Sequence, residues 1–584
     1  MTQRDRARWV FTVPPPASMV RLGACGKGPG IGPLGDRRTL MLVLVVSALL
    51  ATACGWRDNG DERAAVPPEP VPIALPELAR VDAPVEAQIR EKYAAVSQMA
   101  AAGTAAPRDL GNAYGEYGML LHAAEYYEAA TPAYLNAQAL VPDDRRWPYY
   151  LAQLYRSVGD TAAAMAAFRR VLELQPDDVP SLVWLGRMHM DQGQPDLAEP
   201  LFARAQSVAP GVIAAQVGLG QVALARKDYS RAVQLLEGAL KNDPGAASIY
   251  SPLAMAYRGL GQIEKAESLS KEWRNTELAV PDPLRAELET VVQSGLSFEL
   301  RGVRALEAND YPTAAGLFRQ GLALAPPTSA LSRSLRHKLG TALALSGDAA
   351  GAAREFEETV RLAPSGALDE PAAKASYSLG ILHAGNGRQG EAVQHLTAAL
   401  GFKPNYFEAQ IALGDVLRTS GRFEASLPRY AEAVRLNPRA ADARFSYAMA
   451  LIRLRRYADA RAWLEQSVRA QPDRPELANV LARLLATAPD VSVRDGRRAL
   501  AMTEQLAQSH RNADLGETMA MALAEVGSYG DAVSVQRDVL NAVRQAGDAD
   551  AVRRVTANLR LFEGGRPARV PWPDDDPVFT TPVR

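Results

Sequence analysis

The sequence predicts an all-α protein built from repeated pairs of helices. Alanine and leucine are abundant, whereas only 7% of the residues are aromatic, and this composition favours helices over sheets. Prolines recur at an interval of 34 residues along much of the chain, and each interval carries the same pattern of small and apolar residues. A fixed period of this length is typical of a solenoid, in which each unit packs only on its neighbours.

The bulk composition excludes several other classes of protein. The chain has 584 residues and a net charge of −1, so no overall field favours nucleic acid or a membrane surface. Its two cysteines, Cys25 and Cys54, exclude a disulfide framework and a cysteine-rich zinc site. The six histidines are spread over the chain, which makes a metalloenzyme a poor interpretation.

The first 53 residues are interpreted as a leader and signal peptide. Basic Arg37 and Arg38 precede an apolar run of about 14 residues from Leu40, which is shorter than the roughly 20 residues that a membrane-spanning helix needs. The run ends in Leu50-Ala51-Thr52-Ala53-Cys54, which resembles the lipobox of bacterial lipoproteins. The resemblance implies a lipid on Cys54. In a Gram-negative cell, Gly55 at the next position would favour the outer membrane. The alternative is a lone buried cysteine in an apolar helix.

The proline-rich segment after Cys54 predicts an extended tether. Prolines hold a chain extended at about 3 Å per residue. We therefore interpret residues 54–84 as the lipidated cysteine and a spacer that holds the folded body away from the membrane.

Prolines mark the ends of the repeats. Four are spaced by 34 residues, and five more follow after a break at spacings of 38, 40, 34 and 34: Pro142, Pro176, Pro210, Pro244, Pro326, Pro364, Pro404, Pro438 and Pro472. Because proline cannot continue a helix, each one closes the second helix of its unit.

The unit at 179–212 shows the inner pattern. It holds a small residue at its eighth position, a glycine at its fifteenth, a small residue at its twentieth and a large one at its twenty-fourth: Gly186, Gly193, Ala198 and Phe202. The small residues let two antiparallel helices approach closely, and the large residue fills the space between neighbours. The glycine supplies the left-handed cap that ends the first helix.

This pattern resembles the tetratricopeptide repeat family, with about twelve units between Gly111 and Ala546. The resemblance implies a right-handed superhelix whose first helices line a concave binding wall. The predicted organisation is an N-terminal helix at 85–110, repeat blocks at 111–280 and 295–547 with a joint at 281–294 between them, a capping helix at 548–563, and a disordered or loosely draped tail at 564–584.

Positions 2, 5, 9 and 12 of each first helix are expected to face the concave wall. In the second and third units these positions hold Arg146, Tyr149, Gln153, Arg156 and Arg187. In units eight to ten they hold Tyr377, Ile381, Ile411, Phe445 and Met449, with Asp415 and Arg418 between them. The aromatic and apolar members are more exposed than folding alone requires, which indicates a partner-binding groove. The alternative is an ordinary solvated surface.

The sequence carries no motif of an enzyme. It contains no H-E-x-x-H, G-x-S-x-G, Walker or EF-hand pattern, and the segments outside the repeats are too short or too proline-rich for a catalytic domain. His383 and His395 in one repeat, and His189 in "RMHMDQ", are interpreted as surface, groove or packing residues rather than as metal ligands.

The predicted function is a non-catalytic scaffold, anchored by lipid at the periplasmic face of a membrane. Its expected partners are other proteins, bound as a peptide or helix in the groove, and the membrane, bound through the lipid. No cofactor, nucleic acid or small-molecule substrate is expected. The alternative is a cytosolic regulator, or an accessory subunit of an enzyme complex.

Overall fold

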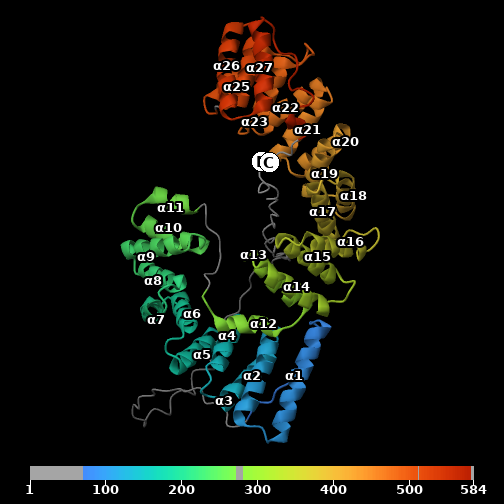
Figure 1. Cartoon of the computed structure of the whole chain (residues 1–584). Helices are drawn as coiled ribbons and strands as arrows, with labels where there is room; N and C mark the ends of the chain where they lie inside the picture. Colours follow the sequence, from blue (N-terminus) through green and yellow to red (C-terminus); the bar gives the residue numbers. More distant parts are fainter. Residues whose placement is uncertain (1–69, 271–279, 511, 581–584) are drawn as a thin grey trace, which may run out of the picture. The chain divides into compact units, whose positions relative to one another are not determined.

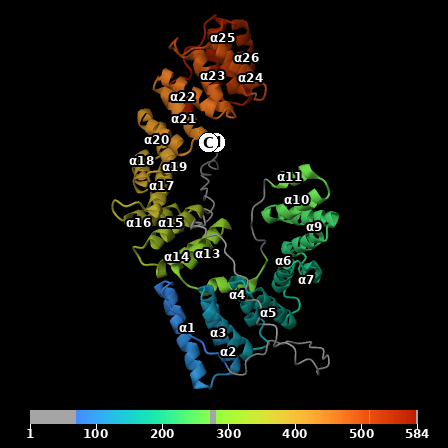
Figure 2. The same cartoon turned by 180° about the vertical axis from the view of Figure 1, so that it is seen from behind.

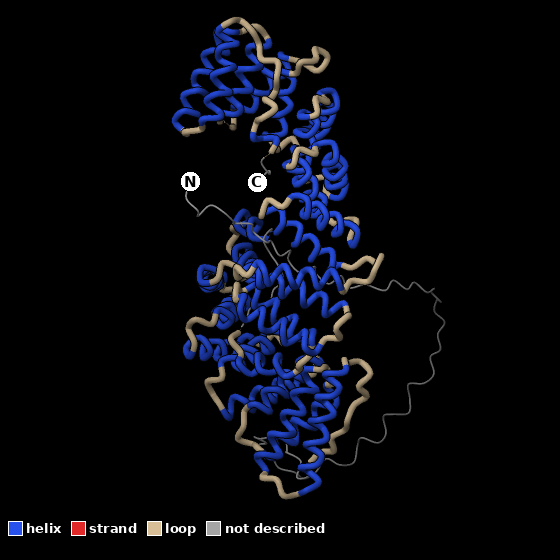
Figure 3. Tube along the Cα trace, turned by 45° about the vertical axis from the view of Figure 1, so that its right-hand side comes forward, coloured by secondary structure: helices blue, strands red, loops and turns tan. Residues whose placement is uncertain are grey.

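The computed structural model describes residues 70–270, 280–510 and 512–580. The chain divides into residues 1–65 and 66–584, and all described residues belong to the second unit. The predicted leader, Cys54 and the first part of the tether lie outside the described residues. Within these ranges the chain forms 27 α-helices and two short 3₁₀ helices without a strand, which confirms the all-α prediction (Figures 1 and 3).

Five antiparallel helix pairs form the first block. They are α2 (Pro107–Ala123) with α3 (Tyr127–Leu140), α4 (Arg146–Val158) with α5 (Thr161–Leu174), α6 (Val179–Asp191) with α7 (Pro195–Val208), α8 (Ile213–Ala225) with α9 (Tyr229–Asn242), and α10 (Tyr250–Gly259) with α11 (Ile263–Ser270). The 3₁₀ helix η1 (Ala247–Ile249) leads into α10.

Seven further pairs form the second block. They are α13 (Gly295–Glu307) with α14 (Tyr311–Leu324), α15 (Ala330–Leu345) with α16 (Ala349–Arg361), α17 (Glu370–Gly385) with α18 (Gln389–Phe402), α19 (Phe407–Thr419) with α20 (Phe423–Leu436), α21 (Ala441–Arg453) with α22 (Tyr457–Ala470), α23 (Pro475–Thr487) with α24 (Gly496–Ala507), and α25 (Ala513–Glu525) with α26 (Tyr529–Gln545). Successive pairs within each block pack side by side (Figure 2).

Besides η1, four helices lie outside the twelve pairs. They are α1 (Ala83–Ala102), α12 (Pro283–Val291), α27 (Ala549–Glu563) and the 3₁₀ helix η2 (Pro577–Phe579). Helix α1 packs on α2, and α27 packs on α26. The segment predicted as one helix at 85–110 is divided, because Gly103 takes a left-handed conformation that ends α1 before α2 begins. None of the described helices is both long and apolar enough to cross a membrane.

A short turn joins the two helices of each pair. In many pairs a left-handed residue ends the first helix, and an aspartate often follows whose side chain caps the second. Gly159 takes a φ of 83°, and Asp160 then accepts a hydrogen bond from the backbone N–H of Ala163. Lys227 and three other non-glycine residues take the same left-handed conformation at equivalent turns. The left-handed turn therefore recurs even in pairs that have no glycine at this position.

The close approach of the helices within a pair depends on a glycine that faces a large side chain. A Cβ added at Gly186 would lie 2.8 Å from Phe202, and one added at Gly218 of the next pair would lie 2.5 Å from the same ring. Phe202 is fully buried between these two glycines. The large residue thus fills the space within its own pair and against the next pair, as the sequence predicts.

The segment at 70–82, which was predicted as part of an extended tether, is packed against the first block. The side chain of Asn136 exchanges two hydrogen bonds with the backbone of Val71, at 2.7 and 2.8 Å. The hydroxyl of Tyr117 donates to the carbonyl of Ala74 at 3.0 Å, and Leu78 is buried. Extended backbone leaves its polar groups free for such side-chain partners, so the described part of the segment belongs to the folded body.

Substitution of Gly186 tests the packing within a pair. We expect Gly186→Leu to overpack α6 against Phe202 and to lower the free energy of unfolding by about 1–3 kcal/mol, measured by urea and thermal unfolding. The control is Gly316→Ala in α14, where nothing lies within 4 Å of the added Cβ. This control should leave stability unchanged or raise it by up to about 1 kcal/mol. Equal stability of the wild type and Gly186→Leu would contradict the packing.

Burial of the His122 ring predicts that the folded protein loses stability in acid. It is buried in α2 with its Nδ1 3.3 Å from the hydroxyl of Tyr134, and burial lowers its pKa to about 4. The unfolded chain, with a histidine pKa near 6.5, takes up the proton first as the pH falls. The free energy of unfolding that depends on the neutral His122 ring is therefore fully present above pH 6.5. It is lost as the pH falls from 6.5 to 4.

We expect His122→Gln to reduce the loss of unfolding free energy between pH 7 and pH 4.5 by about 2 kcal/mol, measured by urea unfolding. His510→Gln, at an exposed position, is the matched control and should behave as the wild type. An unchanged pH profile for His122→Gln would show that the buried ring does not govern acid sensitivity.

Candidate functional site

The inner wall of the array is the face on which the first helices of neighbouring pairs contact one another. Contacts of this kind join α6 to α8, α8 to α10, α13 to α15, α15 to α17, α17 to α19, α19 to α21, and α21 to α23. The predicted groove residues all lie on first helices: Arg146, Tyr149, Gln153 and Arg156 on α4, Arg187 on α6, Tyr377 and Ile381 on α17, Ile411 and Asp415 on α19, and Phe445 and Met449 on α21. Two sections of this wall are covered by other parts of the chain.

Helix α12 covers the wall at α2 and α4. The hydroxyl of Tyr149 donates to the carboxylate of Asp282, and the hydroxyl of Tyr150 donates to that of Glu287 at 3.0 Å. Leu284 is buried in the same apolar cluster as the tyrosines. Because α12 lies on them, both tyrosines are fully buried, so Tyr149 is not the exposed aromatic residue that the sequence led us to expect.

The segment predicted as a joint at 281–294 is therefore mainly a helix that packs on the first block. Asp282 caps its first turn by accepting from the backbone N–H of Arg285 at 3.0 Å. At its other end, the backbone of Gln293 exchanges hydrogen bonds with the side chain of Gln88 in α1, at 2.6 and 3.1 Å. Side-chain hydrogen bonds thus hold both ends of α12. A joint that only bends the chain would need no such contacts.

The remaining predicted groove residues of the first block form two local arrangements. Arg146 is paired with Asp144 at 2.7 Å, and Gln153 is buried with its amide 2.7 Å from the hydroxyl of Tyr149. The guanidinium groups of Arg156 and Arg187 lie 3.9 and 4.8 Å from the ring centre of Trp184. This second arrangement places two cations on one indole at the partly exposed wall of α4 and α6.

The wall of α17 and α19 is more apolar. Tyr377 lies beside Tyr406, with ring centres 5.3 Å apart, and Ile381 and Ile411 are half-buried on the same face. Burial, with a smaller contribution from Glu408, raises the pKa of Tyr377, so its hydroxyl stays protonated. This section is the part of the predicted groove that keeps partly exposed aromatic and aliphatic side chains.

The C-terminal segment covers the wall farther along the second block. Residues 564–584 were predicted to be disordered or loosely draped, but Ala568, Trp572 and Phe579 are buried against the array. Met449, predicted as an exposed groove residue, is fully buried in the same cluster, whereas Phe445 is half-buried. Trp572 and Phe579, the two aromatic residues of this segment, were the sequence signal for this packing.

Asp415, whose side chain is partly exposed, takes part in a polar network with Tyr430 and Arg418. It accepts from the hydroxyl of Tyr430 at 2.8 Å and lies 3.8 Å from the guanidinium of Arg418. Burial raises the pKa of Asp415 above its ordinary value, although the hydrogen bond from Tyr430 opposes that effect. Arg418 is itself fully buried and reaches the C-terminal segment.

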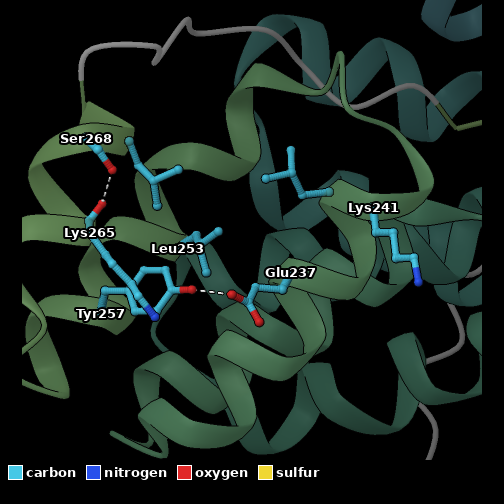
Figure 4. A pocket seen from close by; sticks show the side chains of 8 residues that line it. Glu237, Lys241, Leu253, Tyr257, Lys265 and Ser268 are labelled. Atoms are coloured by element: carbon cyan, nitrogen blue, oxygen red, sulfur yellow. Dashed lines mark hydrogen bonds between the residues drawn. The ribbon is translucent and has the colours of Figure 1, made fainter.

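A cavity of about 430 Å³ lies among α9, α10 and α11 (Figure 4). Its polar groups are bonded to one another: the hydroxyl of Tyr257 donates to Glu237, and that of Ser268 donates to the carbonyl of Lys265 at 2.8 Å. Burial and the hydrogen bond to Glu237 raise the pKa of Tyr257 to about 12. The lining also holds three leucines and the amines of Lys241 and Lys265, and the phenol of Tyr257 stays protonated.

The histidines that the sequence singled out also have packing roles. The rings of His383 and His395 are stacked with centres 5.0 Å apart, and Nδ1 of His189 lies 2.7 Å from the side-chain oxygen of Gln194. Across the described ranges, no group of three or more metal-binding side chains is gathered as a site.

Comparison with known proteins identifies the family. Models of the tetratricopeptide repeat match residues 149–178, 185–247, 223–277, 300–367, 337–407 and 411–475, which together cover about half of the chain. The chain belongs to the tetratricopeptide repeat family. No curated protein sequence matches it significantly.

Solved structures with a similar fold share little sequence with this chain. MamA from Desulfovibrio magneticus RS-1 is 17% identical over 28% of this chain and 92% of its own, with a TM-score of 0.27. YrrB, described as a TPR protein with an unusual peptide-binding site, is 21% identical over 27% of this chain and 82% of its own, with a TM-score of 0.26. A tetratricopeptide repeat protein from Parabacteroides merdae is 16% identical over 45% of this chain and all of its own, with a TM-score of 0.28.

Removing two hydroxyl groups tests the contact of α12 with the wall. We expect the double variant Tyr149→Phe and Tyr150→Phe to release α12 more often, because two hydrogen bonds to carboxylates are lost. Amide exchange of residues 283–291, measured by mass spectrometry, should speed up about tenfold or more, while α6 to α9 keep their protection. Tyr155→Phe on the same helix is the control. Unchanged exchange in the double variant would mean that the hydroxyl groups do not hold α12.

Proposed function

We propose that this chain is a non-catalytic scaffold that binds segments of partner proteins on its inner wall while a lipid on Cys54 anchors it to a membrane. One observation carries the binding role: the wall already accommodates two kinds of segment from the chain itself. Helix α12 lies on α2 and α4, and the irregular segment at 566–580 packs on the second block. A wall that holds both a helix and an irregular segment has the shape and hydrogen-bonding groups to hold those of other proteins.

The section at α17 and α19 is our candidate for the partner's main contact. Tyr377, Ile381 and Ile411 keep partly exposed surface there. Aromatic and aliphatic anchors of this kind contribute most of the binding energy in protein interfaces. The absence of an enzyme motif from the sequence favours a scaffold over a catalyst.

The membrane location rests on the N-terminal sequence. Basic Arg37 and Arg38, the short apolar run and the small residues before Cys54 together support export and lipidation. Several acyl chains on one cysteine would hold the protein firmly on a bilayer. The periplasmic face of the outer membrane is the location that Gly55 favours. If Cys54 carries no lipid, the alternative of a cytosolic regulator or an accessory subunit replaces this proposal.

The test combines membrane fractionation with a pull-down from crosslinked envelopes, read by mass spectrometry. The wild type should be found in membranes with a defined set of envelope proteins, and Cys54→Ser should move to the soluble fraction and lose that set. Ile381→Arg should stay in membranes but lose the partners. Leu368→Arg, at an exposed apolar position in a loop, is the matched control and should keep them. An unchanged membrane fraction for Cys54→Ser would end the lipid-anchor proposal, and partners retained by Ile381→Arg would exclude this section of the wall.

A further inference from the structure

The C-terminal segment at 566–580 lies on the inner wall as a bound peptide would. It follows α27, which ends the array, and it turns back along helices of the second block. Its 3₁₀ helix η2 contacts α21, whose predicted groove residues it helps to cover. The segment is therefore an occupant of the wall and not a repeat of the array.

The wall holds the backbone of this segment directly. The guanidinium of Arg418, which is fully buried, donates to the carbonyl oxygens of Phe579 at 2.8 Å and Val578 at 3.2 Å. Hydrogen bonds to carbonyl oxygens do not depend on which side chains the peptide carries. Both carbonyl oxygens belong to the 3₁₀ helix η2, so this part of the wall holds the end of a short helical turn through its backbone.

Aromatic side chains of the segment occupy positions beside arginines. The ring of Phe579 is buried, with its centre 6.5 Å from that of Phe423 and 5.9 Å from the guanidinium of Arg453. The ring of Trp572 has the guanidinium of Arg483 4.8 Å from its centre. In both contacts the aromatic ring is buried and a cation lies on its face. The two positions on the wall therefore favour a peptide with aromatic residues seven positions apart.

Carboxylates between the two aromatic residues meet further arginines. Asp574 lies 3.6 Å from Arg453 and 3.3 Å from Arg455, and Asp576 lies 3.0 Å from Arg554. The pairs of Asp574 are largely exposed, and exposed pairs contribute little to stability. The arginines of the wall therefore select carboxylates between the two aromatic residues, whereas Arg569 of the segment pairs with Glu525 of α25. The aromatic residues and the carbonyl contacts provide most of the attachment.

We propose that this section of the inner wall is a binding site for segments of partner proteins that carry two aromatic anchors with carboxylates between them, and that the chain's own C-terminal segment occupies it until a partner displaces it. The inference rests on the proposed protein-binding function and specifies the chemistry of one class of partner. A segment joined to α27 by a few residues competes at a millimolar effective concentration. A free peptide should consequently bind the wild type weakly and bind strongly once the attached segment is disabled.

The test uses the full chain and a fluorescent peptide of residues 566–584, with binding measured by fluorescence polarisation. In the protein, the double variant Trp572→Ala and Phe579→Ala should bind this peptide at least tenfold more tightly than the wild type does. A peptide in which phenylalanine at 579 is replaced by alanine is the ligand control and should not bind. Adding Arg453→Glu to the double variant should abolish binding, and circular dichroism with thermal unfolding confirms that each variant is folded.

Two outcomes would overturn the proposal. Equal affinity of the wild type and the double variant would place the peptide on another surface, and no binding to the folded double variant would exclude the site. Light scattering gives a third test, which would overturn the choice of a partner as the occupant. If the mass of the wild type rises with concentration while the double variant stays monomeric, the segment is exchanged with a second copy of the chain. None of these results affects the capture of envelope proteins through Ile381, so failure here is distinguishable from failure of the proposed function.

Discussion

Many of the helix pairs are held by the contact of a small residue in the first helix with a large side chain in the second. Gly186 faces Phe202, Gly340 faces Phe356, and an added Cβ would lie 2.8 and 2.6 Å from these rings. The contact brings the two helices together without a gap, and interiors tolerate gaps poorly. Because the same contact recurs in successive units, it sets the spacing of the pairs, and every surface of the array follows from that spacing.

One consequence is that neighbouring first helices within each block form a row whose outer face is not covered by the second helices of the described pairs. Their outward positions carry tyrosines, arginines and aliphatic side chains, which gain stability from any segment that removes their apolar parts from water. The chain supplies such segments at α12 and at its C-terminus. The same side chains of the wall can therefore be covered either by the chain itself or by a partner protein.

The two covering segments differ in how they are held. Helix α12 offers carboxylates to tyrosine hydroxyl groups that are protonated because burial and the neighbouring carboxylates raise their pKa. The C-terminal segment offers carbonyl oxygens and aromatic rings to arginines, of which Arg418 and Arg483 are fully buried. A buried guanidinium is costly without partners. Arg483 keeps Glu517 at 2.6 Å, whereas Arg418 depends in part on the segment.

The sequence by itself determined the repeat, the helix pairs, their turns and the packing of the glycines on large side chains. These features arise from residues within one unit or between adjacent units, so a 34-residue period records them. It also placed the groove residues on first helices, through their positions in the unit. Only the tertiary structure decided which of them are covered. Tyr149 and Asp282 are 133 residues apart, and Arg418 and Phe579 are 161 residues apart. No period or local pattern encodes such contacts, because they form only after the array has brought its wall and these segments together.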